Sequence, residues 1–369
     1  MLLSSQLSIV IPVLNERDNV APMVERVRSA LPFDGWELIF VDDDSSDGTA
    51  DEVRRVALGE PRVRLILRVA DPGLANSAVQ GLLSGAADIL CVMDGDGQHD
   101  PVYIARMLEV LQRDKADLVS ASRSVQELAG GDALAGKRHL LSRAGNALIR
   151  LATGRDTQDP LTGFFVIRRA AFLSVVRHLS NSGFKLLFDI LATGTQLRHV
   201  EMPFEFKARN AGSSKLGPLV LWQFALLLLE KLTHGWLPAR VASFLVVGST
   251  GLIVHMAVLY SLLGGGAAFS TAQTGAALTA MTFNFTLNNW LTFHDRRFRG
   301  WGLVYGWLAY LLICSVGLAA NVSVASWVYL QLHWFAMFAA LAGIAMDVLW
   351  KFVISDRLLW RRVVKPAAA

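Results

Sequence analysis

Two long stretches of the sequence contain no charged residue. Residues 241–294 and 300–346 lack Asp, Glu, Lys and Arg, although the chain has 35 Lys+Arg and 31 Asp+Glu in 369 residues. A helix needs about 20 apolar residues to cross the hydrocarbon core of a bilayer, so each stretch is long enough for two spans and a turn. The rest of the chain is about a quarter charged, as in an ordinary globular domain. The sequence therefore predicts a soluble domain joined to a membrane domain.

We expect four membrane-spanning helices in the second half of the chain. Their predicted ranges are 241–262, 268–291, 303–330 and 334–354. Basic residues follow the second and the fourth span: Arg296, Arg297, Arg299, Arg357, Arg361, Arg362 and Lys365. Because Lys and Arg concentrate on the cytoplasmic side of a membrane, the link, the tail, both termini and the soluble domain are predicted to be cytoplasmic. The first residues, MLLSSQLSIV, lack the basic region of a signal peptide, which agrees with this orientation.

The segment 217–239 joins the two halves. It is strongly apolar for about a dozen residues, which is too short to span a bilayer. We interpret it as an interfacial helix that lies among the lipid headgroups; the alternative is a surface helix packed on the soluble domain. The predicted boundaries are then 1–216 for the soluble domain, 217–239 for the interfacial helix and linker, and 240–369 for the transmembrane domain.

Charge and cysteine content exclude several classes of protein. A formal net charge of +4 is too small to indicate nucleic-acid binding, and no basic run interleaved with aromatics lies outside the membrane flanks. Cys91 and Cys314 lie in different halves, so a disulfide scaffold is excluded and reduced thiols are expected. Asp347 and Lys351, four residues apart near the end of the last span, are expected to pair on one helix face rather than serve transport.

The first half alternates between strand-like and helix-like segments. The strand-like runs, rich in Val, Ile and Leu, are 6–14, 36–42, 63–69, 88–94, 117–122 and 163–168. Apolar runs separated by helices indicate a mostly parallel sheet that helices cover on both faces. Open sheets of this kind bind ligands beyond the carboxyl ends of their strands. We therefore expect a nucleotide-binding α/β domain with its site at that edge.

Segments that contain polar or charged residues stand at the ends of the first five runs. They are Pro12 to Glu16, Asp42 to Asp44, Arg68, Asp94 to Gln98, and Arg123. The VDDDSSDGT segment alone is equally well explained as a turn and a helix cap. Asp94 and Asp96 are more specific, because a period of two aims both carboxylates to the same side.

Two neighbouring carboxylates at the end of a buried strand require a cation. Hard oxygen ligands favour Mg²⁺ or Mn²⁺, usually shared with substrate phosphates. The chain has no GxxxxGK[ST] and no GxGxxG segment, so we expect a metal rather than a glycine loop to hold the phosphates. His99, beside this loop, is expected to support it rather than to bind the metal.

Six motifs, in this order and spacing, resemble family 2 glycosyltransferases of the dolichol-phosphate mannose synthase type: IPVLNERDNV, VDDDSSDGTADE, GLANSAVQGL, MDGDGQHDP, DPLTGFFVIRR and ARNAGSSKL. The resemblance covers residues 6–216 and implies a GT-A, Rossmann-like fold. The second half resembles the four-helix GtrA-like domain fused to some of these synthases, most tellingly at FNFTLNNWLTF (283–293). Two positions depart from the family: Asp71-Pro72 replaces a common Lys before Gly-Leu, and DGDGQHDP replaces DADLQHPP.

The resemblance implies a role for individual residues. The nucleoside pocket would be formed by Pro12, Leu14, Glu16, Val41 and Asp43. The metal and the diphosphate would be held by Asp94, Asp96 and Gln98, with Gly95 between the two carboxylates and with Arg209 closing over the phosphates. The phosphate of a lipid acceptor would bind Arg123, Arg138 and Ser142. Asp159 and Thr162 would have a structural role near the acceptor pocket.

The implied reaction is a metal-dependent, inverting transfer of mannose from GDP-mannose to a polyprenyl or dolichyl phosphate. A phosphate monoester has its second pKa at about 6, so the acceptor is already largely ionised and needs positioning by arginines rather than a general base. One alternative is transfer from UDP-glucose, or another nucleotide sugar, to undecaprenyl phosphate. An alternative of another class is a transporter of lipid-linked sugars. A processive polysaccharide synthase is disfavoured, because the chain has no QxxRW segment.

Overall fold

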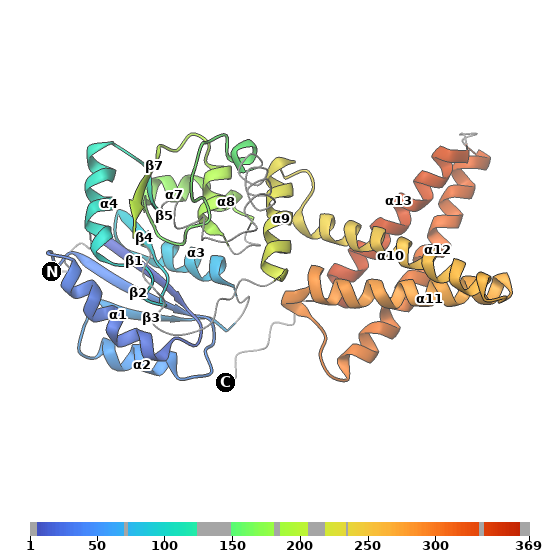
Figure 1. The fold of residues 1–369 in the computed structure, drawn as a ribbon, viewed down its shortest axis with the longest axis horizontal. Coiled ribbons are helices and arrows are strands. Elements are labelled where there is room, and N and C mark those ends of the chain that lie inside the picture. The colour runs from blue at the N-terminus through green and yellow to red at the C-terminus, as the bar shows by residue number, and fades with distance from the viewer. Residues whose placement is uncertain are drawn as a thin grey trace, which may run out of the picture. The chain divides into compact units, whose positions relative to one another are not determined.

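The computed structural model describes residues 6–69, 73–123, 149–180, 185–205, 218–233, 235–331 and 336–361. The chain divides into two compact units, Met1–Gly235 and Trp236–Ala369 (Figure 1). Strands occur in the first unit, and the described part of the second unit is helical.

The described residues of the first unit form a seven-stranded sheet in the order β3-β2-β1-β4-β6-β5-β7. Its strands are β1 (Leu7–Val13), β2 (Trp36–Asp42), β3 (Val63–Leu67), β4 (Ile89–Val92), β5 (Leu118–Arg123), β6 (Phe165–Arg168) and β7 (His199–Phe204). Strand β6 is antiparallel to both of its neighbours, β4 and β5, and the other neighbouring strands are parallel. The prediction of a mostly parallel sheet is confirmed.

Helices cover both faces of this sheet (Figure 1). They are α1 (Arg17–Ala30), α2 (Thr49–Ala57), α3 (Leu74–Ser84), α4 (Val102–Arg113), α7 (Arg169–Val175) and α8 (Leu186–Thr193), with a 3₁₀ turn at Val176–His178. Ile9 and Ile11 of β1 belong to the core formed with α1, α2 and α4, whereas Val10 belongs to the core formed with α3, α7 and α8. Successive side chains of a strand point to opposite faces, which is why β1 is apolar at every one of these positions.

All six predicted runs contain a strand, but two features of the sheet were not predicted. One is the antiparallel direction of β6. The other is β7, whose sequence HVEMPF has only a short apolar pattern. Strand β7 pairs with β5 along six residues, so this pairing rather than burial on both faces accounts for the strand.

Helix α9 (Pro218–Leu232) follows the sheet domain and belongs to the first unit. Leu227 and Leu228 are buried against Phe188 of α8, and the Lys231 ammonium lies 2.5 Å from a carboxylate oxygen of Asp189. One face of α9 is therefore packed on the soluble domain, as in the alternative interpretation of this segment. Leu221, on another face, is 68% exposed, and the position of α9 among lipid headgroups stays a prediction.

The second unit contains α10 (Ala239–Gly264), α11 (Phe269–Leu287), α12 (Gly302–Gln331) and α13 (Ala336–Ile354) in its described residues. Helix α11 continues into a π-helical turn at Asn288–Thr292, and α13 continues into another at Ser355–Leu359. Within the described residues, α10 and residues Gly302–Asn321 of α12 are long and apolar enough to cross a membrane. The prediction of four spans is thus tested only in part and stays a prediction.

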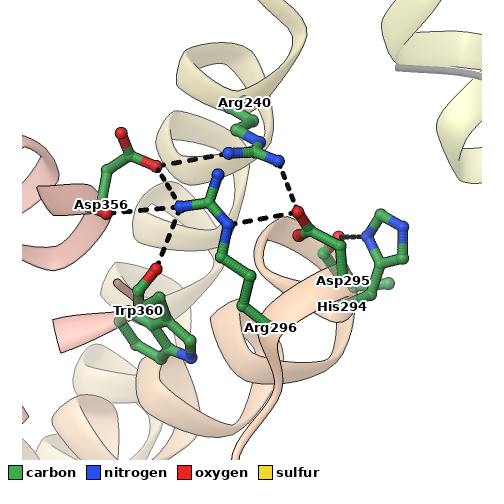
Figure 2. A network of polar contacts seen from close by, with 7 residues as sticks. Arg240, His294, Asp295, Arg296, Asp356 and Trp360 are labelled. Atoms are coloured by element: carbon green, nitrogen blue, oxygen red, sulfur yellow. Dashed lines mark hydrogen bonds and ion pairs between the residues drawn. The ribbon is translucent and has the colours of Figure 1, made fainter. Parts of the chain in front are cut away.

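Paired charges occur within one of these helices and between the ends of several of them. Lys351 and Asp347 of α13 are 2.7 Å apart, which confirms the expected pair. Figure 2 shows a larger group, here called the charge network, which consists of Arg240, Asp295, Arg296, Asp356 and the Trp360 carbonyl.

Within the charge network, each arginine contacts both carboxylates. Arg240 lies 2.7 Å from Asp295 and 3.4 Å from Asp356, and Arg296 lies 3.3 Å and 3.4 Å from the same two carboxylates. Arg296 also donates a hydrogen bond to the Trp360 carbonyl at 3.0 Å. Two positive and two negative groups therefore compensate one another where α10, α11 and α13 begin or end.

Candidate active site

The three parallel strands β2, β1 and β4 bring the predicted motifs to one edge of the sheet. Val13 is in register with Asp42, and the Asp43 amide donates to the Val13 carbonyl at 3.2 Å. On the other side of β1, Val10 is in register with Val92, the last residue of β4. The segments that follow these strands therefore start side by side, as the rule for open α/β sheets requires.

Asp43 is held in a buried polar cluster. One of its carboxylate oxygens is ion-paired with Arg68, and the other accepts a hydrogen bond of 2.7 Å from the Gly73 amide. Arg68 also donates to Ser77 and to Gln80, each at 2.7 Å. The side chains of Arg68 and Asp43 are only 7% and 8% exposed, so their charges are fixed in place. The sequence pattern placed Arg68 at the end of a strand but did not predict this ion pair.

The SSDGT part of the acidic motif forms hydrogen bonds with the loop that follows β1. The Asn15 amide donates to the Ser45 hydroxyl at 2.8 Å, and the Glu16 amide donates to the Thr49 hydroxyl at 3.0 Å. Asp47 accepts a hydrogen bond from the Arg17 amide at 3.1 Å. The segment forms the turn before α2, but the N-cap of that helix is Gly48 without a side-chain cap, and the contacts instead fix the loop that carries Leu14 and Glu16. Burial raises the pKa of the Asp42 carboxyl, the first of the motif, above its usual value.

The loop after β4 presents alternate residues to the outside. Asp94, Asp96 and Gln98 are partly exposed, whereas Gly95, Gly97 and His99 are buried. Asp96 accepts a hydrogen bond of 3.1 Å from the Gln98 amide, which tightens the turn at Gly97, where φ is +82°. Asp94, Asp96 and Gln98 therefore all reach the surface of the protein, and their orientation toward one metal ion stays a prediction.

Four contacts fix this loop. The Asp94 amide donates to Nδ1 of His99 at 3.0 Å, and the His99 ring stacks on Phe164 with 5.0 Å between ring centroids. Arg26 of α1 donates to the carbonyls of Gly97 and His99 at 3.1 Å and 3.2 Å. Because Nδ1 accepts a hydrogen bond, it carries no proton in this arrangement. His99 thus supports the loop, as expected.

Gly163, in the DPLTGFF motif, lies against the first carboxylate of the loop. A Cβ atom at Gly163 would lie 2.8 Å from a carboxylate oxygen of Asp94, which is closer than real Cβ contacts. The preceding residues of the motif are anchored from β7, because Glu201 accepts hydrogen bonds from the amides of Gln158 and Asp159. The motif therefore shapes one wall beside Asp94, and Asp159 itself is buried.

The loop offers ligands that fit a divalent cation shared with a phosphate ligand. In the described part of the chain, no three His, Cys, Asp or Glu side chains lie together as a metal site. The two carboxylates of Asp94 and Asp96 and the amide of Gln98 are oxygen ligands, which suit Mg²⁺ or Mn²⁺. Mg²⁺ usually binds one or two carboxylates and completes its shell with water and substrate phosphates. The residues therefore fit an ion that arrives with a diphosphate.

The residues expected around the acceptor are described only in part. Arg123 is the last residue of β5, which runs in the same direction as β4, so it stands at the same edge as Asp94. Arg138, Ser142 and Arg209 lie outside the described residues. Of the expected nucleoside residues, Pro12 and Val41 lie in β1 and β2, and Leu14 is 42% exposed beside them.

Two family profiles match the chain. Residues 8–175 match Glycosyl transferase family 2, and residues 243–360 match the GtrA/DPMS transmembrane domain. The second match and the two apolar helices indicate a membrane protein.

Curated relatives cover both halves. The chain is 29% identical over 359 residues to a dolichol-phosphate mannosyltransferase of Pyrococcus furiosus, with 96% of this chain and 99% of the relative covered. It is 30% identical over 215 residues to an undecaprenyl-phosphate mannosyltransferase of Micrococcus luteus, with 56% of this chain and 86% of the relative covered. A solved structure, glucosyl-3-phosphoglycerate synthase of Mycobacterium tuberculosis, is similar with a TM-score of 0.45 and 18% identity, over 62% of this chain and 80% of that one.

Proposed function

We propose, from the fact that the chain belongs to glycosyl transferase family 2, that it transfers mannose from GDP-mannose to the phosphate of a membrane polyprenyl or dolichyl phosphate. The product would be a polyprenyl-phosphate β-mannose. The names of the relatives support the sugar and the lipid. The observation that carries the proposal is the partial exposure of Asp94, Asp96 and Gln98 in the loop after β4, at the edge of the sheet where Asp43 also lies.

The donor would bind across this edge. Pro12, Leu14, Glu16, Val41 and Asp43 would hold its nucleoside, with Asp43 kept in position by Arg68. Asp94, Asp96 and Gln98 would hold a Mg²⁺ or Mn²⁺ ion, and Arg209 would lie on the phosphates. When bound, the ion would neutralise the negative charge that develops on the diphosphate as the bond to the sugar breaks.

The acceptor phosphate would bind Arg123, Arg138 and Ser142. Its oxygen would attack the anomeric carbon directly, so that an α-linked donor gives a β-linked product. Since the second pKa of a phosphate monoester is about 6, this chain needs no general base, and its arginines would orient the nucleophile. The GtrA/DPMS domain would keep the reaction at the bilayer surface, with the catalytic domain and both termini in the cytoplasm.

The proposal is tested with the full chain in detergent. Radiolabelled GDP-mannose, a polyprenyl phosphate and Mg²⁺ or Mn²⁺ should give a lipid-soluble, mild-acid-labile product. A parallel arm with UDP-glucose tests the alternative donor, because transfer from UDP-glucose alone would replace mannose in the proposal. Absence of transfer from every nucleotide sugar, together with sugar-lipid movement across vesicles, would favour the transporter instead.

A further inference from the structure

The basic residues that follow the second and the fourth predicted span fall into two groups. Arg296 belongs to the charge network, in which two carboxylates compensate two arginines. The arginines of the other group are exposed, and in the described part of the chain they form no ion pair with a carboxylate. This group, here called the basic rim, consists of Arg297, Arg299, Arg357 and Arg361. Four positive charges are therefore uncompensated next to a network that is neutral.

Buried side chains join the two segments that carry the basic rim. Asn289 donates a hydrogen bond of 3.3 Å to the Phe298 carbonyl and accepts one of 2.8 Å from the Phe298 amide. The same Asn289 side chain accepts a hydrogen bond of 3.1 Å from the indole nitrogen of Trp360, and Figure 2 shows Arg296 reaching the Trp360 carbonyl. Phe298 stands between two arginines of the basic rim, and Trp360 precedes a third. The backbone that carries these arginines is therefore fixed in place.

Large apolar side chains next to these arginines are also exposed. Trp301 is 83% exposed and Leu358 is 66% exposed. The uncharged stretches 241–294 and 300–346 lie on either side of Arg297 and Arg299. Tryptophan and arginine are enriched at the ends of membrane helices, where a ring or an alkyl stem contacts hydrocarbon and a polar end stays in water. The surroundings of the basic rim therefore indicate contact with lipid headgroups.

An anionic phospholipid fits both features of this surface. Its phosphate diester accepts hydrogen bonds from guanidinium groups, and its acyl chains can contact Trp301 and Leu358. A nucleic acid or an acidic protein would match the charges but would leave the apolar side chains unused. A single phosphate monoester would require arginines that converge on one point, whereas those of the basic rim are exposed and spread over two segments. Several diester headgroups suit such an arrangement better.

We infer that the basic rim binds the headgroups of anionic phospholipids and thereby holds the membrane domain at one surface of the bilayer. The inference goes beyond the proposed sugar transfer and does not depend on it. Each arginine near an anionic leaflet adds an attraction that salt weakens. The charge network adds little to this attraction, because its positive and negative groups already compensate one another.

The test measures thermal unfolding of the full chain in neutral detergent mixed with phosphatidylglycerol or with phosphatidylcholine. Phosphatidylglycerol should raise the melting temperature by about 5 °C more than phosphatidylcholine does, because the anionic lipid binds the folded membrane domain. This difference should shrink at about 1 M salt. It should disappear when Arg297→Gln, Arg299→Gln, Arg357→Gln and Arg361→Gln are combined. In detergent alone this variant should melt like the wild type, since no ion pair is removed.

A smaller variant decides the question if the fourfold variant does not fold. Arg297→Gln with Arg299→Gln should lose about half of the difference between the two lipids, because half of the charges are removed. Its matched control is Arg106→Gln with Arg113→Gln. These two exposed arginines lie on α4, on the face of the sheet opposite to α8, against which α9 packs. The control should keep the whole difference.

Native mass spectrometry of the same samples measures the bound lipid directly. The wild type should retain phosphatidylglycerol that the fourfold variant loses, and both should retain phosphatidylcholine equally. A third arm contains polyprenyl phosphate, and loss of this lipid alone from the fourfold variant would assign the basic rim to the acceptor and overturn the inference. Equal stabilisation of the wild type by both phospholipids would overturn it too, as would undiminished retention of phosphatidylglycerol in the variants of the basic rim.

Discussion

The two units of the molecule use charged side chains in opposite ways. In the charge network of the second unit, Arg240 and Arg296 each contact both Asp295 and Asp356, so that the four charges compensate within the protein. At the edge of the sheet, Asp94 and Asp96 are partly exposed in the loop after β4, and 38% of the Asp94 side chain is accessible to solvent. A compensated group stabilises a fold, whereas carboxylates in a partly exposed loop can bind a cation. Substitutions in the two places should therefore affect different properties.

The largest effect is expected from Asp96→Ala. The variant should lose about 10³-fold in the rate of sugar transfer, because charge stabilisation of the leaving diphosphate would be lost. Its melting temperature should fall only slightly, because the variant loses the hydrogen bond that Asp96 accepts from the Gln98 amide in a partly exposed loop. Transfer rate and thermal unfolding of the full chain are the two measurements. Asp114→Ala, which removes an exposed partner of Arg113, is the control, and wild-type activity in Asp96→Ala would exclude a role in the reaction.

The charge network should show the reverse behaviour. Arg296→Met leaves Asp295 and Asp356 with one arginine instead of two, and should lower the free energy of unfolding by about 2–3 kcal/mol, somewhat less than for a fully buried pair. The KM for the nucleotide sugar should not change. Arg357→Met, at an exposed neighbouring arginine, should be nearly neutral. An increase of this KM in Arg296→Met, with unchanged thermal unfolding, would contradict the different roles of charge in the two units.

Acidification should destabilise the first unit through His199. Burial, and secondarily the positive charge of Arg155, lower the pKa of His199 from its ordinary value of 6.5 to about 4. Between these two values the unfolded chain binds more protons than the folded chain, so stability is lost as the pH falls from about 6.5 towards 4. At pH 5 the loss should be at most about 2 kcal/mol.

Thermal unfolding at pH 7 and at pH 5 measures this loss. His199→Gln, which replaces the ring that contacts Ser120 at 2.8 Å, should flatten the pH dependence. Arg296→Met should leave the pH dependence as it is. An unchanged slope in His199→Gln would assign the acid response to other groups.

The smallest effect is expected from Gly163→Ala. The added Cβ atom would displace the Asp94 carboxylate, so the concentration of Mg²⁺ or Mn²⁺ needed for half-maximal transfer should rise by about tenfold, near 1.4 kcal/mol. Gly59→Ala is a matched control, because its Cβ atom would make an ordinary 3.7 Å contact. An unchanged metal requirement would show that the position of Asp94 is not limiting.

The sequence predicts the strands of the first unit well where helices bury both faces of the strand. All six apolar runs contain strands because helices cover both faces of these segments. It fails for β7, where His199 and Glu201 interrupt the apolar pattern and pairing with β5 supplies the order. It also fails for one face of α9, since the pairing of Lys231 with Asp189 depends on a contact between two helices that are distant in sequence.

The site follows the same division. The sequence correctly predicts that Asp94 and Asp96 follow directly after a strand, whereas their common orientation toward a metal stays a prediction. The pairing of Asp43 with Arg68 and the close approach of Gly163 to Asp94 arise from segments that meet only in the folded chain. A local sequence pattern does not predict such contacts between distant segments. The acceptor residues Arg138 and Ser142 stay predictions from the family resemblance.

Arg26 and His99 hold the loop after β4 by contacts that involve no ligand. The conformational entropy of ordering this loop is thus lost once, during folding, and is not lost again in each round of turnover. Binding of the donor should accordingly be a single fast step, without a slow conformational change of this loop. A slow step in the catalytic cycle should occur elsewhere, for example in the release of the nucleotide product.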